Sequence, residues 1–203
     1  MSETTLAASN AANNYTLKNN EDGSFAIKKA TTDVLTISAT GIIQPASGQI
    51  LFPSVQNPSS DVHILDDYEE GSFTPAFSAT GCTFNYVIAS GRYIKIGRLV
   101  SANILVMLAG SGNTLAANAV SITGLPFLSD AAGTTSICHA AWGNINTAVY
   151  SISGILQASA SSISLSKITA ATTLSGSPAL LGTDLSAASG TYIQLSITYQ
   201  ADA

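Results

Sequence analysis

The sequence carries little charge, and this scarcity narrows the classes of protein to consider. Of its 203 residues, 9% are charged, with seven basic and twelve acidic side chains, whereas about a quarter is usual for a globular protein. Beyond Arg98 the charged residues are Asp130, Lys167, Asp184 and Asp202. A surface with so few charges favours association. We therefore expect a symmetric oligomer that buries much of this surface.

Clustered basic residues and long apolar runs are also scarce. A net charge of −5, with one short basic group between Arg92 and Arg98, argues against a nucleic-acid partner, because phosphate neutralisation needs many Lys and Arg side chains. The longest apolar run, near residues 104–109, is too short to span a bilayer. The first residues have neither the basic region nor the apolar run of a signal peptide. We expect no membrane insertion and no signal peptide.

Candidate catalytic groups are few. A glycosidase needs two carboxylates flanking the scissile bond, and the C-terminal part offers only Asp130, Asp184 and Asp202, which lie in predicted loops or at the terminus. A Ser-His-Asp triad needs an oriented histidine, but His139 lies within a predicted strand, His63 lies in a predicted linker, and neither follows a Gly-x-Ser-x-Gly elbow. The histidines and cysteines also lack zinc-ligand spacing. We predict neither an enzyme nor a cofactor.

Short alternating segments predict an all-β protein. Residues 15–43 hold three such segments separated by turns, which predicts a short β-meander. Three short strands cannot bury a core alone, so three copies around an axis are expected to bury Phe25, Ile27, Leu35 and Ile37 together. Residues 1–14 show no periodicity and are expected to form an extended anchor or tail, with a frayed terminus as the alternative.

Residues 44–71 are predicted to form a proline-containing linker that ends in an acidic hinge. The acidic residues of the hinge are Asp66, Asp67, Glu69 and Glu70. They are interpreted as a solvated turn or a single helical turn. A calcium site at a subunit junction is the alternative, because hard cations prefer carboxylate oxygens, although the spacing of a calcium-binding loop is absent.

Residues 72–203 are predicted to form an antiparallel β-sandwich head of jelly-roll type. Its expected strands cover residues 83–88, 91–96, 100–108, 119–123, 136–142, 148–153, 162–168 and 192–199. The clearest alternation lies in the last of them. Its apolar residues and those of 100–108 are expected to contribute to a trimer core through Ile104, Val106, Leu195 and Ile197.

A predicted hairpin in the head carries the candidate ligand-binding residues, which are Trp142, Asn144, Asn146 and Tyr150. Aromatic rings beside amide side chains suit sugar recognition, since the ring supplies contact area and the amides bind hydroxyl groups. The alternative is that Trp142 belongs to the core and that the loop is an ordinary turn.

Four phrases of the sequence carry a resemblance to a known family. They are GQILFPS (residues 48–54), LDDYEEGSFTP (65–75), GRYIKIG (91–97) and ITGLPF (122–127). Together they resemble the C-terminal domain of bacteriophage tail fibres and related virion appendages, in which phrases close to LDDYEEGTFTP, GRYTKIG and GLPF follow one another. The resemblance covers roughly residues 15–127, and beyond Phe127 only the general composition is similar.

The resemblance implies a homotrimeric structural protein of the virion, with a meander stalk and a head that contributes to host-surface attachment. Its partners would be two further copies, other virion proteins at the N-terminal segment, and a cell-surface glycan. A head fibre or capsid decoration protein of similar fold is the first alternative, a polysaccharide-degrading tailspike the second, and a bacterial adhesin the third. Folding in a reducing cytoplasm would leave Cys82 and Cys138 as free thiols, although their spacing allows a disulfide.

Overall fold

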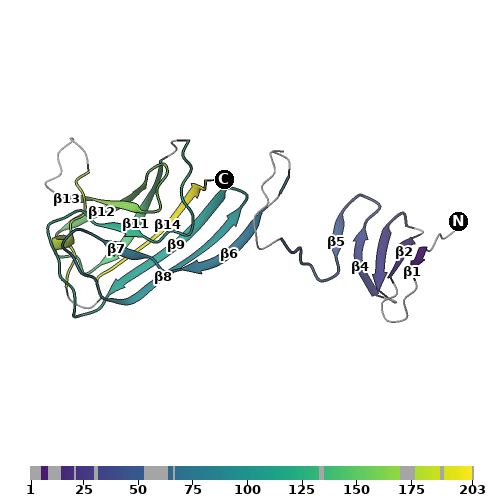
Figure 1. The fold of residues 1–203 in the computed structure, drawn as a ribbon, viewed down its shortest axis with the longest axis horizontal. Coiled ribbons are helices and arrows are strands. Elements are labelled where there is room, and N and C mark those ends of the chain that lie inside the picture. The colour runs from purple at the N-terminus through teal and green to yellow at the C-terminus, as the bar shows by residue number, and fades with distance from the viewer. Residues whose placement is uncertain are drawn as a thin grey trace. The chain divides into compact units, whose positions relative to one another are not determined.

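The computed structural model describes residues 6–8, 15–20, 22–29, 32–52, 64–65, 67–132, 135–169, 177–187 and 190–202. The chain divides into two compact units, Met1–Phe52 and Pro53–Ala203 (Figure 1). The described residues form strands and one short 3-10 turn, η1 (Gly182–Asp184), without an α-helix. The predicted all-β class is therefore confirmed. Within the same residues, no helix is long and apolar enough to cross a membrane.

The first unit is a five-stranded antiparallel meander in which each strand pairs with the next one along the chain. Its strands are β1 (Leu6–Ala8), β2 (Tyr15–Asn19), β3 (Phe25–Lys29), β4 (Thr32–Ile37) and β5 (Ile43–Pro45). Strand β1 lies inside the predicted N-terminal anchor, whose other residues are outside the described part. Gly23 and Gly41 have φ angles of 83° and 84°, which glycine adopts without strain in tight turns.

One face of the meander is apolar and the other is polar. Directly opposed residues of paired strands share a face, and the register places seven apolar residues on one face: Leu17, Phe25, Ile27, Leu35, Ile37, Ile43 and Pro45. The paired positions on the other side include Lys18, Thr36 and Gln44. Among the described side chains of this unit, only Ala26 is fully buried. Within the described residues, no second layer of the unit therefore covers its apolar face.

The second unit is a nine-stranded antiparallel sheet in the order β6-β8-β9-β14-β11-β12-β13-β10-β7. Its strands are β6 (Tyr68–Phe73), β7 (Ala76–Ser78), β8 (Tyr86–Ile96), β9 (Leu99–Leu108), β10 (Ser121–Thr123), β11 (Ser136–Gly143), β12 (Val149–Leu156), β13 (Ile163–Thr169) and β14 (Tyr192–Gln200). The edge strands β6 and β7 are joined by Thr74 and Pro75, which span about 11 Å at most. The sheet therefore curls until its edges approach each other (Figure 1). This is the sandwich-like architecture expected for the head.

The core of the head lies inside the curled sheet. Alternate residues of each strand face inward, so β14 buries Ile193, Leu195, Ile197 and Tyr199, and β9 buries every second residue from Val100 to Leu108. These side chains pack with inward residues of β11, β12 and β13 into one cluster.

The predicted trimer-core residues of the head are buried within a single chain. Ile104, Val106, Leu195 and Ile197 are between 0% and 3% exposed, so they have no surface left for a partner subunit. Their assignment to a trimer interface is wrong, because a strand face that covers its own core shows the same alternation as one that covers a neighbour.

The acidic phrase is not a hinge. It opens strand β6, which pairs with β8 over its whole length, so the head sheet begins at Tyr68 rather than after Gly71. One proline of the predicted linker, Pro45, is the last residue of strand β5. The other two lie among residues 53–63, which are outside the described part. The expected strand 91–96 and the last three residues of the expected strand 83–88 belong to the single strand β8.

The exposed side of edge strand β7 is covered by a side chain. The Tyr86 hydroxyl accepts a hydrogen bond from the Phe77 amide at 2.8 Å and donates one to the Phe77 carbonyl at 3.2 Å. Burial raises the pKa of Tyr86, so the hydroxyl keeps the proton that it donates. The Phe77 ring packs edge-on against Phe84, with 5.6 Å between centroids. The free backbone groups at the centre of this three-residue edge are therefore satisfied.

Candidate functional site

Two of the phrases quoted above form neighbouring strands. LDDYEEGSFTP supplies β6, and GRYIKIG supplies the second half of β8. Each of two glycines lies under an aromatic ring of the opposite strand. A Cβ on Gly71 would lie 2.8 Å from the Tyr93 hydroxyl oxygen, and a Cβ on Gly91 would lie 2.4 Å from the Phe73 ring. A side chain would displace these rings, so cross-strand ring packing explains both glycines.

The phrase ITGLPF meets these two strands at a buried ion pair. Lys95 Nζ contacts Asp67 Oδ2, and the two residues are 2% and 5% exposed. The Lys95 ammonium also lies 5.4 Å from the ring centroid of Phe127, the last residue of ITGLPF, in a cation–π arrangement. Phe127 packs edge-on against Tyr93, with 5.1 Å between centroids. We name Asp67, Phe73, Tyr93, Lys95 and Phe127 the motif cluster.

The strand geometry separates the four candidate metal ligands. Asp67 contacts Lys95, and Glu69 accepts a hydrogen bond from Tyr93. Successive side chains of a strand alternate between faces, so Glu70 lies on the face opposite to both. Asp66 is outside the described part, and the described residues contain no group of three possible metal ligands. The solvated-turn interpretation is replaced by a strand whose described carboxylates are divided between two faces. A calcium site shared between subunits stays a prediction.

Tyr93 is held in its protonated form within this cluster. Burial first, and then the hydrogen bond and the charge of Glu69, raise the pKa of Tyr93 to about 12. Because the Tyr93 hydroxyl loses its proton only in strong base, it remains a hydrogen-bond donor to Glu69. The motif cluster therefore has the properties of a structural fastening between β6, β8 and the segment before β11, and not those of a reactive site.

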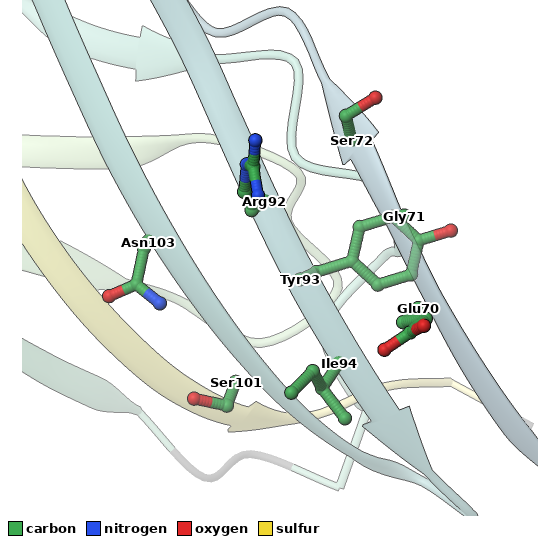
Figure 2. A pocket seen from close by; sticks show the side chains of 8 residues that line it. All are labelled: Glu70, Gly71, Ser72, Arg92, Tyr93, Ile94, Ser101 and Asn103. Atoms are coloured by element: carbon green, nitrogen blue, oxygen red, sulfur yellow. The ribbon is translucent and has the colours of Figure 1, made fainter.

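A groove of about 600 Å³ lies on the outward side of the sheet, over β6, β8 and β9 (Figure 2). Its lining includes Glu70, Ser72, Arg92, Ile94, Ser101 and Asn103. Ser72, Arg92 and Asn103 lie directly opposite one another across the three strands. Sequence reasoning missed this groove, because the acidic phrase was interpreted as a hinge. The alternation in 68–73 and 92–96 is the signal that identifies these residues as one surface.

The hairpin between β11 and β12 forms as predicted, but its candidate residues differ in environment. Trp142 packs against the core cluster, on the same side of β11 as Cys138 and Ala140. Asn146 donates from its side-chain amide to the Leu185 carbonyl at 2.8 Å. Asn144 is exposed at a φ of 52°, and Tyr150 is 70% exposed. Trp142 and Asn146 therefore hold the loop, and Asn144 and Tyr150 remain on the surface.

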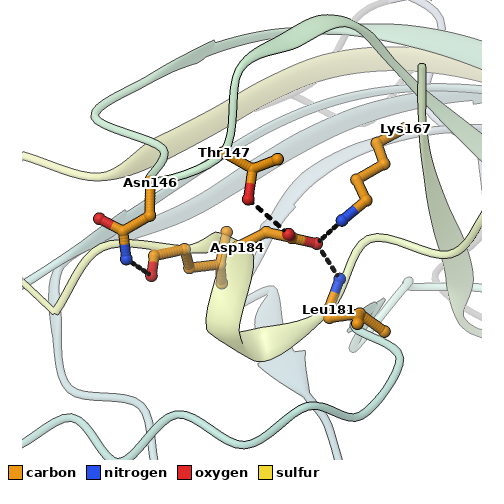
Figure 3. Close-up of polar contacts among 6 residues, drawn as sticks. Asn146, Thr147, Lys167, Leu181 and Asp184 are labelled. Carbon is orange, nitrogen blue, oxygen red and sulfur yellow. Dashed lines mark hydrogen bonds and ion pairs between the residues drawn. The ribbon is translucent and has the colours of Figure 1, made fainter. Parts of the chain in front are cut away.

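Asp184 anchors this loop from below (Figure 3). Its carboxylate accepts hydrogen bonds from the Thr147 hydroxyl and the Leu181 amide, both at 2.7 Å, and pairs with Lys167. Burial acts to raise the pKa of Asp184, but the bonds from Lys167, Leu181 and Thr147 outweigh it and hold the pKa below its usual value. A carboxylate with this many internal donors is a structural group and offers no free oxygen for hydrolysis.

The remaining candidate groups that the structure describes make separate local contacts, and His63 lies outside the described residues. Asp130 pairs with Arg98 at 2.9 Å. Cys82 and Cys138 are both free thiols, and burial raises the pKa of Cys138 to about 11. His139 lies on the outward side of β11, next to the Ser153 hydroxyl at 3.2 Å and opposite in direction to Cys138. Each group serves a local contact.

Neither a model of any protein family, nor a curated protein, nor a solved structure matches this chain.

Proposed function

We propose that this chain is a structural component of a bacteriophage virion, a homotrimeric tail fibre or fibre-tip protein that takes part in attachment to the host surface. Two observations support the proposal. Three of the four phrases that resemble the tail-fibre domain meet in the motif cluster, so these three describe one structural unit. The meander of the first unit has an apolar face that the described residues of the unit leave uncovered, and this second observation carries the proposal.

The apolar face of the meander is costly to leave in water. Ile43 is 64% exposed and Leu17 is 37% exposed. Full burial of one such side chain contributes about 1.5–3 kcal/mol, and a small sheet without a packing partner is marginally stable. Further copies of the chain supply the same face. Three copies around an axis would turn their apolar faces toward one another and enclose Phe25, Ile27 and Leu35, in a closed symmetric assembly.

Attachment to the host would be multivalent. Several trimers on one particle convert weak contacts into strong overall binding, because each contact after the first is intramolecular. Two exposed side chains of the hairpin are Asn144 of the β11–β12 loop and Tyr150 of β12. The Tyr150 ring supports a glycan contact through stacking. Tyr150→Ala is expected to reduce binding to host cells, with Ile137→Ala, another exposed position, as the control. Equal binding of both variants would remove this loop from consideration.

The oligomeric state tests the proposal most directly. Light scattering of the full chain is expected to give the mass of a trimer. Ile43→Asp should shift the mass toward the monomer, because it places a charge on the apolar face, whereas Gln44→Asp on the opposite face of the same strand should not. Both positions are exposed, so the meander itself can tolerate either change. A wild-type monomer at all concentrations would overturn the proposal.

The location on the particle separates a tail fibre from a capsid fibre. Electron microscopy of particles that carry labelled chain is expected to place the label on the tail. Label on the capsid would favour the head-fibre alternative while leaving the trimeric assembly unaffected.

A further inference from the structure

The outward side of β6, β8 and β9 carries an apolar row beside the groove. Tyr68, Ile96 and Leu99 lie directly opposite one another across the three strands, and they are 42%, 47% and 45% exposed. Ile94, two residues before Ile96 and on the same side, is 46% exposed. We name this surface, together with Glu70 and Arg92, the outer face. Adjacent exposed apolar residues of this kind mark an interaction surface.

The outer face also holds the one basic side chain of the described head that has no carboxylate partner. Lys95, Arg98 and Lys167 each pair with an aspartate. Arg92 is exposed, and within the described residues it makes neither an ion pair nor a side-chain hydrogen bond. Its cross-strand neighbours are Ser72 and Asn103, and the apolar row lies further along the same side of the sheet. In a chain with so few charges, an arginine left unmatched beside an apolar row points to a partner from outside the chain.

A carboxylate of the same surface has the complementary charge. Glu70 lies on the neighbouring strand, two residues from Ser72, which is the residue opposite Arg92, and therefore on the same face. It accepts a hydrogen bond from the Tyr68 hydroxyl at 3.2 Å. Figure 2 shows both side chains on the outward side of the sheet. One cation and one anion beside an apolar row make the outer face complementary to itself.

We propose that the outer face is the contact between the heads of neighbouring copies of this chain, with Arg92 of one copy paired with Glu70 of the next. This inference rests on the proposed homo-oligomer and adds a second contact to that of the meander. A copy of the chain presents both charges, whereas an anionic polymer would be repelled by Glu70 and a cationic one by Arg92. The apolar row packs between the copies, and the groove beside it receives side chains of the neighbour.

Charge reversal in the full chain tests the pairing. Arg92→Glu or Glu70→Arg alone should raise the dissociation constant of the oligomer, measured by sedimentation over a dilution series, by at least about tenfold. Mixing the two variants should recover much of the affinity, because opposite charges then face each other across the contact. Recovery in the mixture requires that the pair lies between chains. Unchanged affinity for both single variants would overturn the inference.

A crosslinking pair provides an independent readout. Ile94→Cys is expected to crosslink between chains with a short bis-maleimide, and Ile137→Cys, which lies on β11 and is 66% exposed, is the matched control. Both are made in a chain with Cys82 and Cys138 replaced by serine, and circular dichroism verifies the fold. Crosslinking at 94 and not at 137 supports the inference. Equal yields at both positions, or none at 94, contradict it.

Three outcomes separate this inference from the proposed function. If Ile43→Asp dissociates the oligomer and Arg92→Glu does not weaken it, the head contact is wrong and the meander contact stands. If the wild-type chain is a monomer, both fail. If Arg92→Glu leaves the oligomer intact but abolishes binding to a host glycan, the outer face is a ligand site and the inference is overturned.

Discussion

The two units of this chain use the same kind of strand but differ in how their sheets are covered. The head sheet curls, and its two edge strands, β6 and β7, follow one another in the chain. It buries residues such as Ile152 and Leu165 completely or nearly so. The meander is a single layer in which Ala26 alone, of the described side chains, is fully buried. Strand alternation thus produces an independent core only where the sheet folds over itself.

Each unit also contains a Lys–Asp pair that links neighbouring segments of its sheet, and the pairs differ in burial. In the head, the side chains of Lys95 and Asp67 are 2% and 7% exposed. In the meander, those of Lys28 and Asp33 are 22% and 44% exposed. Water screens the second pair and not the first. The contrast predicts different energies for the same chemical contact.

The largest expected effect follows from breaking the buried pair. Asp67→Ala leaves Lys95 charged and buried beside Phe127, and such a change typically costs about 3–5 kcal/mol. Urea unfolding of the head should show this loss. The double variant Asp67→Leu with Lys95→Met should regain most of it, because no charge is then buried. A loss below 1 kcal/mol for Asp67→Ala would mean that water reaches the pair.

A matched pair of isoleucines compares the cores. Ile152→Ala removes a fully buried side chain and should cost the head about 2–5 kcal/mol, independent of chain concentration. Ile27→Ala should instead lower the melting temperature by an amount that grows on dilution, because its burial depends on association. Thermal melts at several concentrations provide the measurement. Dilution-independent melting of the Ile27→Ala variant would show that the meander is stable alone.

The anchor at Asp184 predicts how acid affects the head. The folded-state pKa of Asp184 is below the usual 3.8, so its stabilisation is present in full above that value and is lost as the pH falls through the folded pKa. Asp184→Asn should flatten this part of the stability curve. Urea unfolding between pH 5 and pH 2, with pH values chosen about this pKa, tests the slope. An unchanged slope in the variant would assign it to other carboxylates.

The smallest effect is expected at the exposed pair of the meander. Lys28→Ala should change stability by less than about 1 kcal/mol, since exposed ion pairs contribute about 0–1 kcal/mol. Added salt should reduce even this difference. Unfolding of the assembled chain at low and high salt gives both values, and a loss comparable to that of Asp67→Ala would remove the contrast between the two units.

Sequence patterns identified the strands but not what covers them. The alternation in Tyr192–Gln200 identified a strand with one buried face, and the structure confirms it. The same alternation did not reveal that Leu195 and Ile197 cover their own core, because periodicity reports burial without naming the partner. In the meander the same reasoning correctly grouped Phe25 and Ile27 with residues of the next strand on one face.

The prediction of a hinge at the acidic phrase differs most from the structure, and the reason is physical. Four carboxylates in five residues suggested solvent exposure, but the charge of Asp67 is compensated by Lys95, 28 positions away. A cross-strand partner at that distance becomes visible only when the register is known. The outer face was missed for the same reason, since Glu70 and Arg92 share a surface only once their strands are paired.

The Tyr86 hydroxyl, which bonds to both backbone groups of Phe77, bears on solubility. Strand edges with free amide and carbonyl groups can add strands from other molecules and grow into fibrillar aggregates, and a weakly charged protein has little repulsion to prevent this. Here one edge strand has three residues and its central backbone groups are already occupied. At this edge of the head sheet, protection against the addition of further strands therefore comes from geometry, where many proteins rely on charge.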